Sequence, residues 1–143
     1  MTIKQISVFL ENKKGRLAKL TGVLKENNID ISAISIADTS NFGIIRIIVN
    51  KPESAEDIIR DAGFTVNIAD VLAVEVPDTP GGLHEVLEIL NQTEISIEYL
   101  YSFVRRPSER ALILFRVEQP EDTIEILKKN GINLLTSQEV YEL

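Results

Sequence analysis

The chain has no cysteine, no tryptophan and a single histidine among its 143 residues. Without cysteine, disulfide bonds, thiolate zinc sites, iron–sulfur clusters and cysteine nucleophiles are excluded. A His-rich metal site is impossible with one histidine, and a Ser-His-Asp constellation would have to be built around His84. We therefore expect no metal site and no cofactor, and the residues make no convincing enzyme.

Long apolar runs, phosphate-binding glycine motifs and excess basic charge are also missing. No apolar stretch approaches the roughly 20 residues that span a bilayer, and neither GxGxxG nor GxxxxGK[ST] occurs. The 15 Lys and Arg residues are outnumbered by 22 Asp and Glu, which gives a net charge of −7. Because phosphate backbones attract basic surfaces, we do not expect this acidic chain to bind nucleic acid. Without a membrane-spanning stretch, we expect a cytoplasmic protein that does not bind a membrane.

The sequence repeats itself once. Gly15-Arg16-Leu17 aligns with Gly81-Gly82-Leu83 at a shift of 66 residues, and the shift changes to 70 and then to 68 only within predicted loops. Such a pattern is typical of a duplicated fold. It predicts two units, residues 1–70 and 71–143, and the lack of a Gly/Ser or Pro-rich linker predicts that they pack rigidly together.

Each copy has the order strand, helix, strand, strand, helix, strand. In the first copy we expect a strand through Ile6–Leu10, a helix over about 16–27, strands over 29–37 and 44–49 with a hairpin at 38–43, a helix after Pro52 capped by Ser54, and a short strand from Phe64. The second copy repeats this order with a longer hairpin at 105–110. The order predicts an α+β protein of two tandem ferredoxin-like units, each an antiparallel four-stranded sheet with two helices on one face.

The two strand-to-helix turns, residues 10–17 and 76–83, are the candidate sites. Lys13, Lys14 and Arg16 oppose the dipole at the helix start, and local rules tend to be broken where a site is built. Free amides, glycines and cations together would hold a carboxylate. Spacing alone supports equally well a simple tight turn with the lysines in water. The second turn has acidic Asp78 instead, which would suit an ammonium group.

At these turns the sequence resembles ACT domains. Ser7–Leu17 and Val76–Leu83 look like the first strand and glycine turn of this family, and the resemblance covers nearly the whole chain twice. It implies the βαββαβ fold and a bacterial regulatory protein made of two tandem ACT domains. The sequence motif Leu-Glu-Asn-x-x-Gly-x-Leu of the first copy is also similar to that of the regulatory small subunits of acetolactate synthase.

The resemblance implies that an amino acid binds at an interface between modules, near the glycine turn of one and the second strand of its neighbour. Carried over by position, the ligand-binding residues are Glu11, Asn12, Lys13, Lys14, Gly15, Arg16, Leu17 and Ile31 in the first copy, and Asp78, Thr79, Pro80, Gly81, Gly82, Leu83 and Ile97 in the second. Our leading hypothesis is a non-catalytic amino-acid-binding regulator that forms a homodimer. The alternative is a regulatory or assembly subunit whose main partner is a biosynthetic enzyme.

Overall fold

The computed structural model describes all residues except 12, 39–41 and 105–109, so half of the predicted connection at 38–43 and all but one residue of that at 105–110 lie outside it. Seven strands and five helices form in this part of the chain: β1 (Ile3–Glu11), α1 (Arg16–Glu26), β2 (Ile31–Asp38), β3 (Phe42–Val49), α2 (Pro52–Asp61), β4 (Thr65–Pro77), α3 (Gly82–Asn91), β5 (Ile97–Ser102), β6 (Arg110–Val117), α4 (Pro120–Lys129), β7 (Asn133–Leu134) and α5 (Ser137–Tyr141). None of the described helices is both long and apolar enough to cross a membrane.

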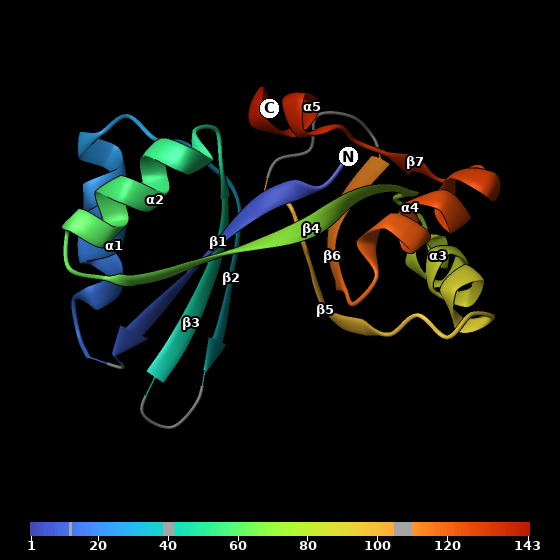
Figure 1. Ribbon diagram of the computed structural model, residues 1–143, viewed down its shortest axis with the longest axis horizontal. Coiled ribbons are helices and arrows are strands. Elements are labelled where there is room, and N and C mark those ends of the chain that lie inside the picture. The colour runs from blue at the N-terminus through green and yellow to red at the C-terminus, as the bar shows by residue number, and fades with distance from the viewer. Residues whose placement is uncertain (12, 39–41, 105–109) are drawn as a thin grey trace.

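The strands form one antiparallel sheet in the order β2-β3-β1-β4-β6-β5, with β7 also paired to β4. Strand β4 runs through both halves of the molecule (Figure 1). It pairs with β1 over Thr65–Val71 and with β6 over Leu72–Pro77. It is therefore the last strand of one βαββαβ unit and the first of the next, which confirms the predicted fold class.

The predicted short strand from Phe64 is wrong in length, because β4 continues for 13 residues. The apolar residues Val66 and Ile68 alternate with polar ones, and the chain contains neither glycine nor proline from there to Leu72, where the second copy starts. Nothing in the sequence stops the extended backbone there, and both edges of β4 find partners. The predicted division between residues 70 and 71 falls inside this strand.

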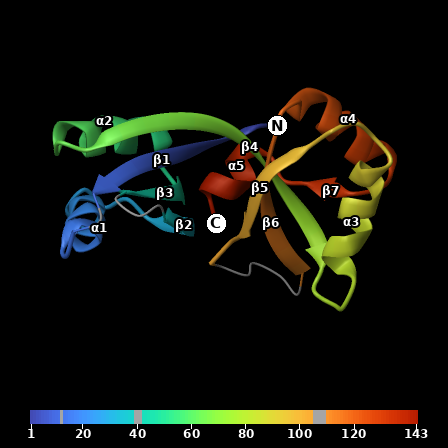
Figure 2. The ribbon, with the colours of Figure 1, turned by 90° about the horizontal axis from the view of Figure 1, so that it is seen from below.

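Helices cover the outer face of each half, α1 and α2 on one side and α3 and α4 on the other (Figure 2). In the first half, Ile6, Val8 and Leu10 point from β1 into a buried cluster with Leu20 and Leu24 of α1, as the period of two predicts. Each such side chain contributes about 1.5–3 kcal/mol when fully buried. An equivalent cluster packs beneath α3 and α4.

Two details of the helices differ from the sequence-based expectations. Ser54 does not cap α2, which begins at Pro52 with Lys51 as its N-cap, because proline is favoured in the first helical turn, where its missing N–H would have no partner anyway. Helix α5 was not predicted, since its five residues are too few to show a period; Thr136 caps it by accepting a hydrogen bond from the Glu139 amide.

The two halves meet through the faces that α1–α4 leave uncovered. A third apolar cluster joins Ile3 and Ile48 of the first half to Phe103 and Leu114 of the second, and Val140 of α5 closes it. The edge strands also approach each other there, through a bridge between Ala33 and Phe103. The halves therefore share a core of their own.

A polar cluster lies beside this shared core. The Gln5 side chain is fully buried, and its amide donates to the hydroxyls of Tyr99 (2.7 Å) and Ser7 (3.2 Å). The Tyr101 hydroxyl donates to the Gln5 carbonyl oxygen at 2.7 Å. The Arg46 guanidinium lies 3.8 Å from the centre of the Tyr99 ring. Strands β1 and β3 of one half are thus tied to β5 of the other.

We expect this cluster to make the protein sensitive to base. Burial is the main reason that the pKa of Tyr101 is raised far above its ordinary value of 10.0. A raised pKa gives stability that is complete below about pH 10, where the unfolded tyrosine is still neutral, and that is lost as the pH rises above it. Tyr101→Phe should reduce the fall in unfolding free energy between about pH 8 and about pH 11 by on the order of 1 kcal/mol.

Urea titrations at both pH values measure this difference. Tyr141→Phe is a useful comparison, because burial also raises the pKa of Tyr141, although its hydroxyl accepts a hydrogen bond from the Lys4 amide and not from the cluster. An unchanged pH dependence in Tyr101→Phe would show that this hydroxyl ionises freely in the folded protein.

Candidate functional site

The two glycine turns have the same backbone geometry. Gly15 precedes α1 with φ 90° and ψ −11°, and Gly81 precedes α3 with φ 90° and ψ −8°. These left-handed conformations strain any residue with a Cβ atom. The amides of Arg16 and Gly82 donate to the carbonyls of Lys13 (3.3 Å) and Thr79 (3.0 Å). Neither helix start has a side-chain cap among the described residues, so the second and third amides of α1 and α3 are left to water or a ligand.

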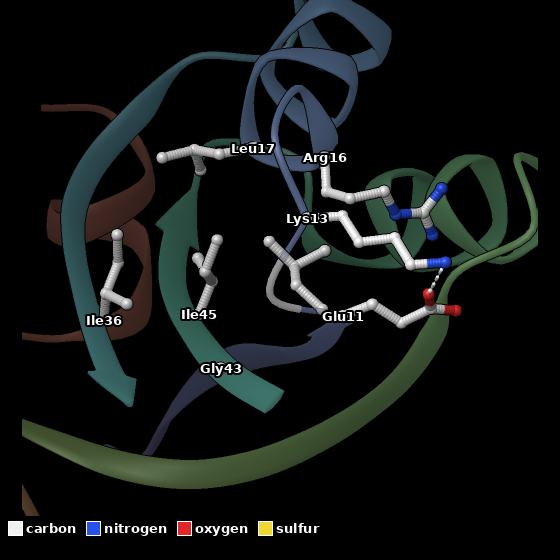
Figure 3. Close-up of a pocket in the computed structure, with 8 residues that line it drawn as sticks. Glu11, Lys13, Arg16, Leu17, Ile36, Gly43 and Ile45 are labelled. Carbon is white, nitrogen blue, oxygen red and sulfur yellow. Dashed lines mark ion pairs between the residues drawn. The ribbon is translucent and has the colours of Figure 1, made fainter. Parts of the chain in front are cut away.

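The first turn borders a hollow of about 140 Å³. Its lining comes from β1, the turn, α1, β2 and β3: Leu10, Glu11, Lys13, Arg16, Leu17, Ile36, Gly43 and Ile45. Figure 3 shows that the apolar side chains of Leu17, Ile36 and Ile45 gather at one end of this group and that the charged ends of Glu11, Lys13 and Arg16 gather at the other. The hollow therefore has an apolar end and a charged end.

The charged side chains around this end of the hollow interact with one another and with an aromatic ring. Lys13 Nζ lies 2.9 Å from Glu11 Oε2, and the hydrogen bond and positive charge of Lys13 hold the pKa of Glu11 below its ordinary value of 4.5. The guanidinium of Arg16 and the ammonium of Lys19 lie 4.7 and 5.6 Å from the centre of the Phe64 ring. Cation–π contacts and this ion pair offset part of the dipole penalty of placing cations at a helix start.

Arg16 retains one unused donor. Its Nε–H is buried and has no hydrogen-bond acceptor among the residues that the structure describes. A buried donor without an acceptor costs about 1–3 kcal/mol, so such groups call for an explanation. An anion entering the charged end of the hollow would supply the acceptor.

Arg16 also separates this hollow from another. On its other side lies a hollow of about 150 Å³ with an aromatic lining that includes Phe9, Phe42 and Phe64, and Glu11 borders both spaces. The Arg16 side chain therefore borders both hollows.

The structure brings together four of the eight residues predicted for the first site. Glu11, Lys13, Arg16 and Leu17 line the hollow, whereas Lys14 and Gly15 lie exposed in the adjacent turn and Asn12 lies outside the described residues. Ile31 pairs with Val49 at the opposite end of β2 from Ile36 and packs against the first core. Within one chain it does not reach the turn, and its role toward a neighbouring module stays a prediction.

Four lining residues were missed by sequence reasoning: Leu10, Ile36, Gly43 and Ile45. They meet because Leu10 lies opposite Gly43 in the β1–β3 pair and Ile36 lies opposite Ile45 in the β2–β3 pair. Strand periodicity shows which face each residue occupies but gives no register between strands. Only Leu10, next to the predicted turn, had a local signal.

The second turn is built differently at one position. Asp78, Thr79, Pro80 and Gly81 are exposed, while Leu83 and Ile97 pack against the second core. Gly82 occupies the position that Arg16 has in the first copy, and a Cβ atom there would lie 2.0 Å from the carbonyl oxygen of Pro77. The backbone of β4 therefore leaves no room for the side chain that borders both hollows in the first half.

Comparisons with known proteins agree with this architecture. A family model described as ACT domain pair matches residues 1–143. The crystal structure of protein BT0572 from Bacteroides thetaiotaomicron is similar with a TM-score of 0.94 and 41% identity, covering 100% of this chain and 98% of that one. The comparison with curated proteins gives no match.

Regulatory subunits of aspartate kinase share the fold at lower identity. The ligand-free subunit from Thermus thermophilus aligns with a TM-score of 0.63 and 17% identity over 88% of this chain and 91% of that one. The subunit from Thermus flavus aligns with a TM-score of 0.60 and 17% identity over 88% and 90%. At this level of identity the likeness concerns the fold.

Proposed function

The chain belongs over its whole length to the ACT domain pair family, and on that basis we propose that it is a non-catalytic regulatory protein that binds a free amino acid at the first glycine turn. The ligand would lie in the hollow between Glu11, Arg16 and Ile36. Its carboxylate would face Arg16 and the free amides of α1, and its ammonium group would face Glu11.

The observation that carries this proposal is that Arg16, which lines the hollow, has a buried Nε–H without an acceptor among the described residues. A carboxylate would satisfy this donor, and charge-assisted hydrogen bonds of this kind are roughly twice as strong as neutral ones. Glu11 supplies a negative charge beside it and forms an ion pair with Lys13. A zwitterion fits opposite charges placed this close together.

Calorimetric titration and thermal shift with each of the twenty amino acids test the proposal. At least one should raise the melting temperature, because a ligand at a hundredfold above its Kd stabilises the folded state by about 2.7 kcal/mol. We expect Arg16→Met, which keeps most of the stem but removes every donor, to weaken this binding at least tenfold, equivalent to about 1.4 kcal/mol.

Lys19→Met is the matched control. Lys19 is a second cation over the Phe64 ring but does not line the first hollow, so its removal should leave the affinity within about twofold, a difference of less than 0.5 kcal/mol by the same relation. If both variants bind the amino acid with the affinity of the wild type, Arg16 does not contact the ligand. If no amino acid gives a response, the proposed function is refuted.

Contact with another chain is the second candidate function. Phe9 and Ile36 border the two hollows and are 43% and 51% exposed, although both are large apolar residues. A homodimer or a biosynthetic enzyme partner that covers this end of the first half would bury them. Light scattering of the purified protein distinguishes these two, since a homodimer doubles the 16.0 kDa chain mass without any other component.

A further inference from the structure

The geometry points to an aliphatic amino acid as the ligand of the first turn, with a branched side chain of three or four carbons at the apolar end of the hollow. This inference rests on the proposed function and narrows it to a substrate class. It follows from the lining, the volume and the separation of charged from apolar groups.

The apolar end has both a buried floor and an exposed rim. Leu10 and Ile45 form the floor and are 6% and 1% exposed, whereas Leu17 and Ile36 form the rim and are 39% and 51% exposed. The rim side chains come from α1 and β2 and lie beside Ile45, with Leu17 above it and Ile36 to its left in Figure 3. A third apolar group placed between them would cover surface that is now in water, which is favourable.

The side chains that line this end are all apolar. All the charged groups of the hollow belong to Glu11, Lys13 and Arg16, and these are directed away from Leu17, Ile36 and Ile45 in Figure 3. A polar or charged ligand side chain among the four aliphatic residues would lose its hydrogen bonds to water without replacement. The charged end can hold the α-carboxylate and α-ammonium groups that every amino acid carries. Selectivity between amino acids therefore depends on the apolar end.

The size of the hollow sets the length of the side chain. Its volume of about 140 Å³ is close to that of an apolar cavity of about 150 Å³ that accepts benzene. Gly43 adds no side chain to the floor, although alternation places it on the same face of β3 as Ile45. The same volume must also hold the α-carbon, carboxylate and ammonium group of the ligand, so the space left for the side chain fits an aliphatic group of three or four carbons, whereas an indole exceeds it.

Calorimetry with leucine, isoleucine, valine, alanine, aspartate and lysine tests the inference. Each buried methylene should tighten binding about fourfold, so the best of the three branched amino acids should bind at least tenfold more tightly than alanine. Aspartate and lysine should bind no better than alanine. Leu17→Ser and Ile36→Ser should each reduce the affinity for the branched ligand at least fivefold while changing that for alanine less than twofold.

Leu100→Ser is the matched control, because Leu100 is 36% exposed and lies on β5, away from the hollow. It should leave all affinities unchanged. If a polar amino acid binds as tightly as the branched ones, or if Leu17→Ser and Ile36→Ser weaken alanine and the branched ligand alike, the aliphatic assignment is overturned while amino-acid binding stands. If none of the twenty amino acids binds, both proposals fall.

Discussion

Replacing Gly82 by alanine should destabilise the protein by about 3 kcal/mol or more, the upper range for forcing extra volume into a packed site. The new Cβ atom would lie 2.0 Å from the carbonyl oxygen of Pro77, and backbone atoms at that separation must move apart. Pro77 ends β4 and Gly82 begins α3, so the shift would separate a helix from its own sheet. Thermal and urea unfolding measure the loss.

Two other glycines supply matched controls. Gly81 has φ +90° and Gly22 lies within α1, and a Cβ atom at either would meet nothing within 4 Å. Gly81→Ala should cost about 1–2 kcal/mol through backbone strain alone, while Gly22→Ala should stabilise by about 0.5–1 kcal/mol. If Gly82→Ala unfolds like Gly81→Ala, the close approach of the β4 backbone is not present in solution.

Gln5→Met should destabilise the protein by about 3 kcal/mol, because two half-buried tyrosine hydroxyls lose their partner at once and each unsatisfied group costs about 1–3 kcal/mol. Methionine conserves the side-chain length, so the loss reports the hydrogen bonds to Tyr99 and Tyr101 and little cavity formation. Since these bonds connect β1 to β5, the substitution should weaken the attachment of the two halves. Denaturant unfolding measures the change.

A matched variant separates the hydrogen bonds from packing. Adding Tyr99→Phe and Tyr101→Phe to Gln5→Met removes both tyrosine hydroxyls that would be unsatisfied. The half-buried Ser7 hydroxyl also loses its Gln5 partner, so stability should recover to within about 1 kcal/mol of the wild type. Tyr101→Phe alone should be destabilising, because it leaves the carbonyl oxygen of Gln5 without its 2.7 Å donor. Additive losses across the three substitutions would show that the cluster does not act as a unit.

The duplication was predictable from the sequence because both copies show the same local patterns of apolar residues and glycines. Alternation at Ile6, Val8 and Leu10 and the left-handed glycines ahead of α1 and α3 depend on neighbouring residues alone. Asn28, just beyond α1, has φ 55°, a conformation that asparagine adopts more readily than most residues. The shared strand β4 escaped prediction because nothing local distinguishes a strand that ends from one that continues into the next unit.

The candidate site was only half predictable. The charged residues of the first turn stand close together in sequence and break a local rule of helix starts, which made them visible. Ile36 and Ile45 lie far along the chain and reach the hollow through the register of β2, β3 and β1. Register depends on which faces become buried together and on the connections between strands, neither of which a single segment encodes.

By itself, the sequence determined that two similar βαββαβ units follow each other, where their glycine turns lie and which charges stand at each turn. Only the tertiary structure decided that β4 would serve both units, that Gln5 would be buried against two tyrosines of the other half, and that the two turns would differ in space. Arg16 has room where Gly82 has none, because the carbonyl of Pro77 fills that volume. Secondary structure follows from interactions between near neighbours, whereas cavities and buried polar contacts follow from backbone segments that meet only in the folded chain.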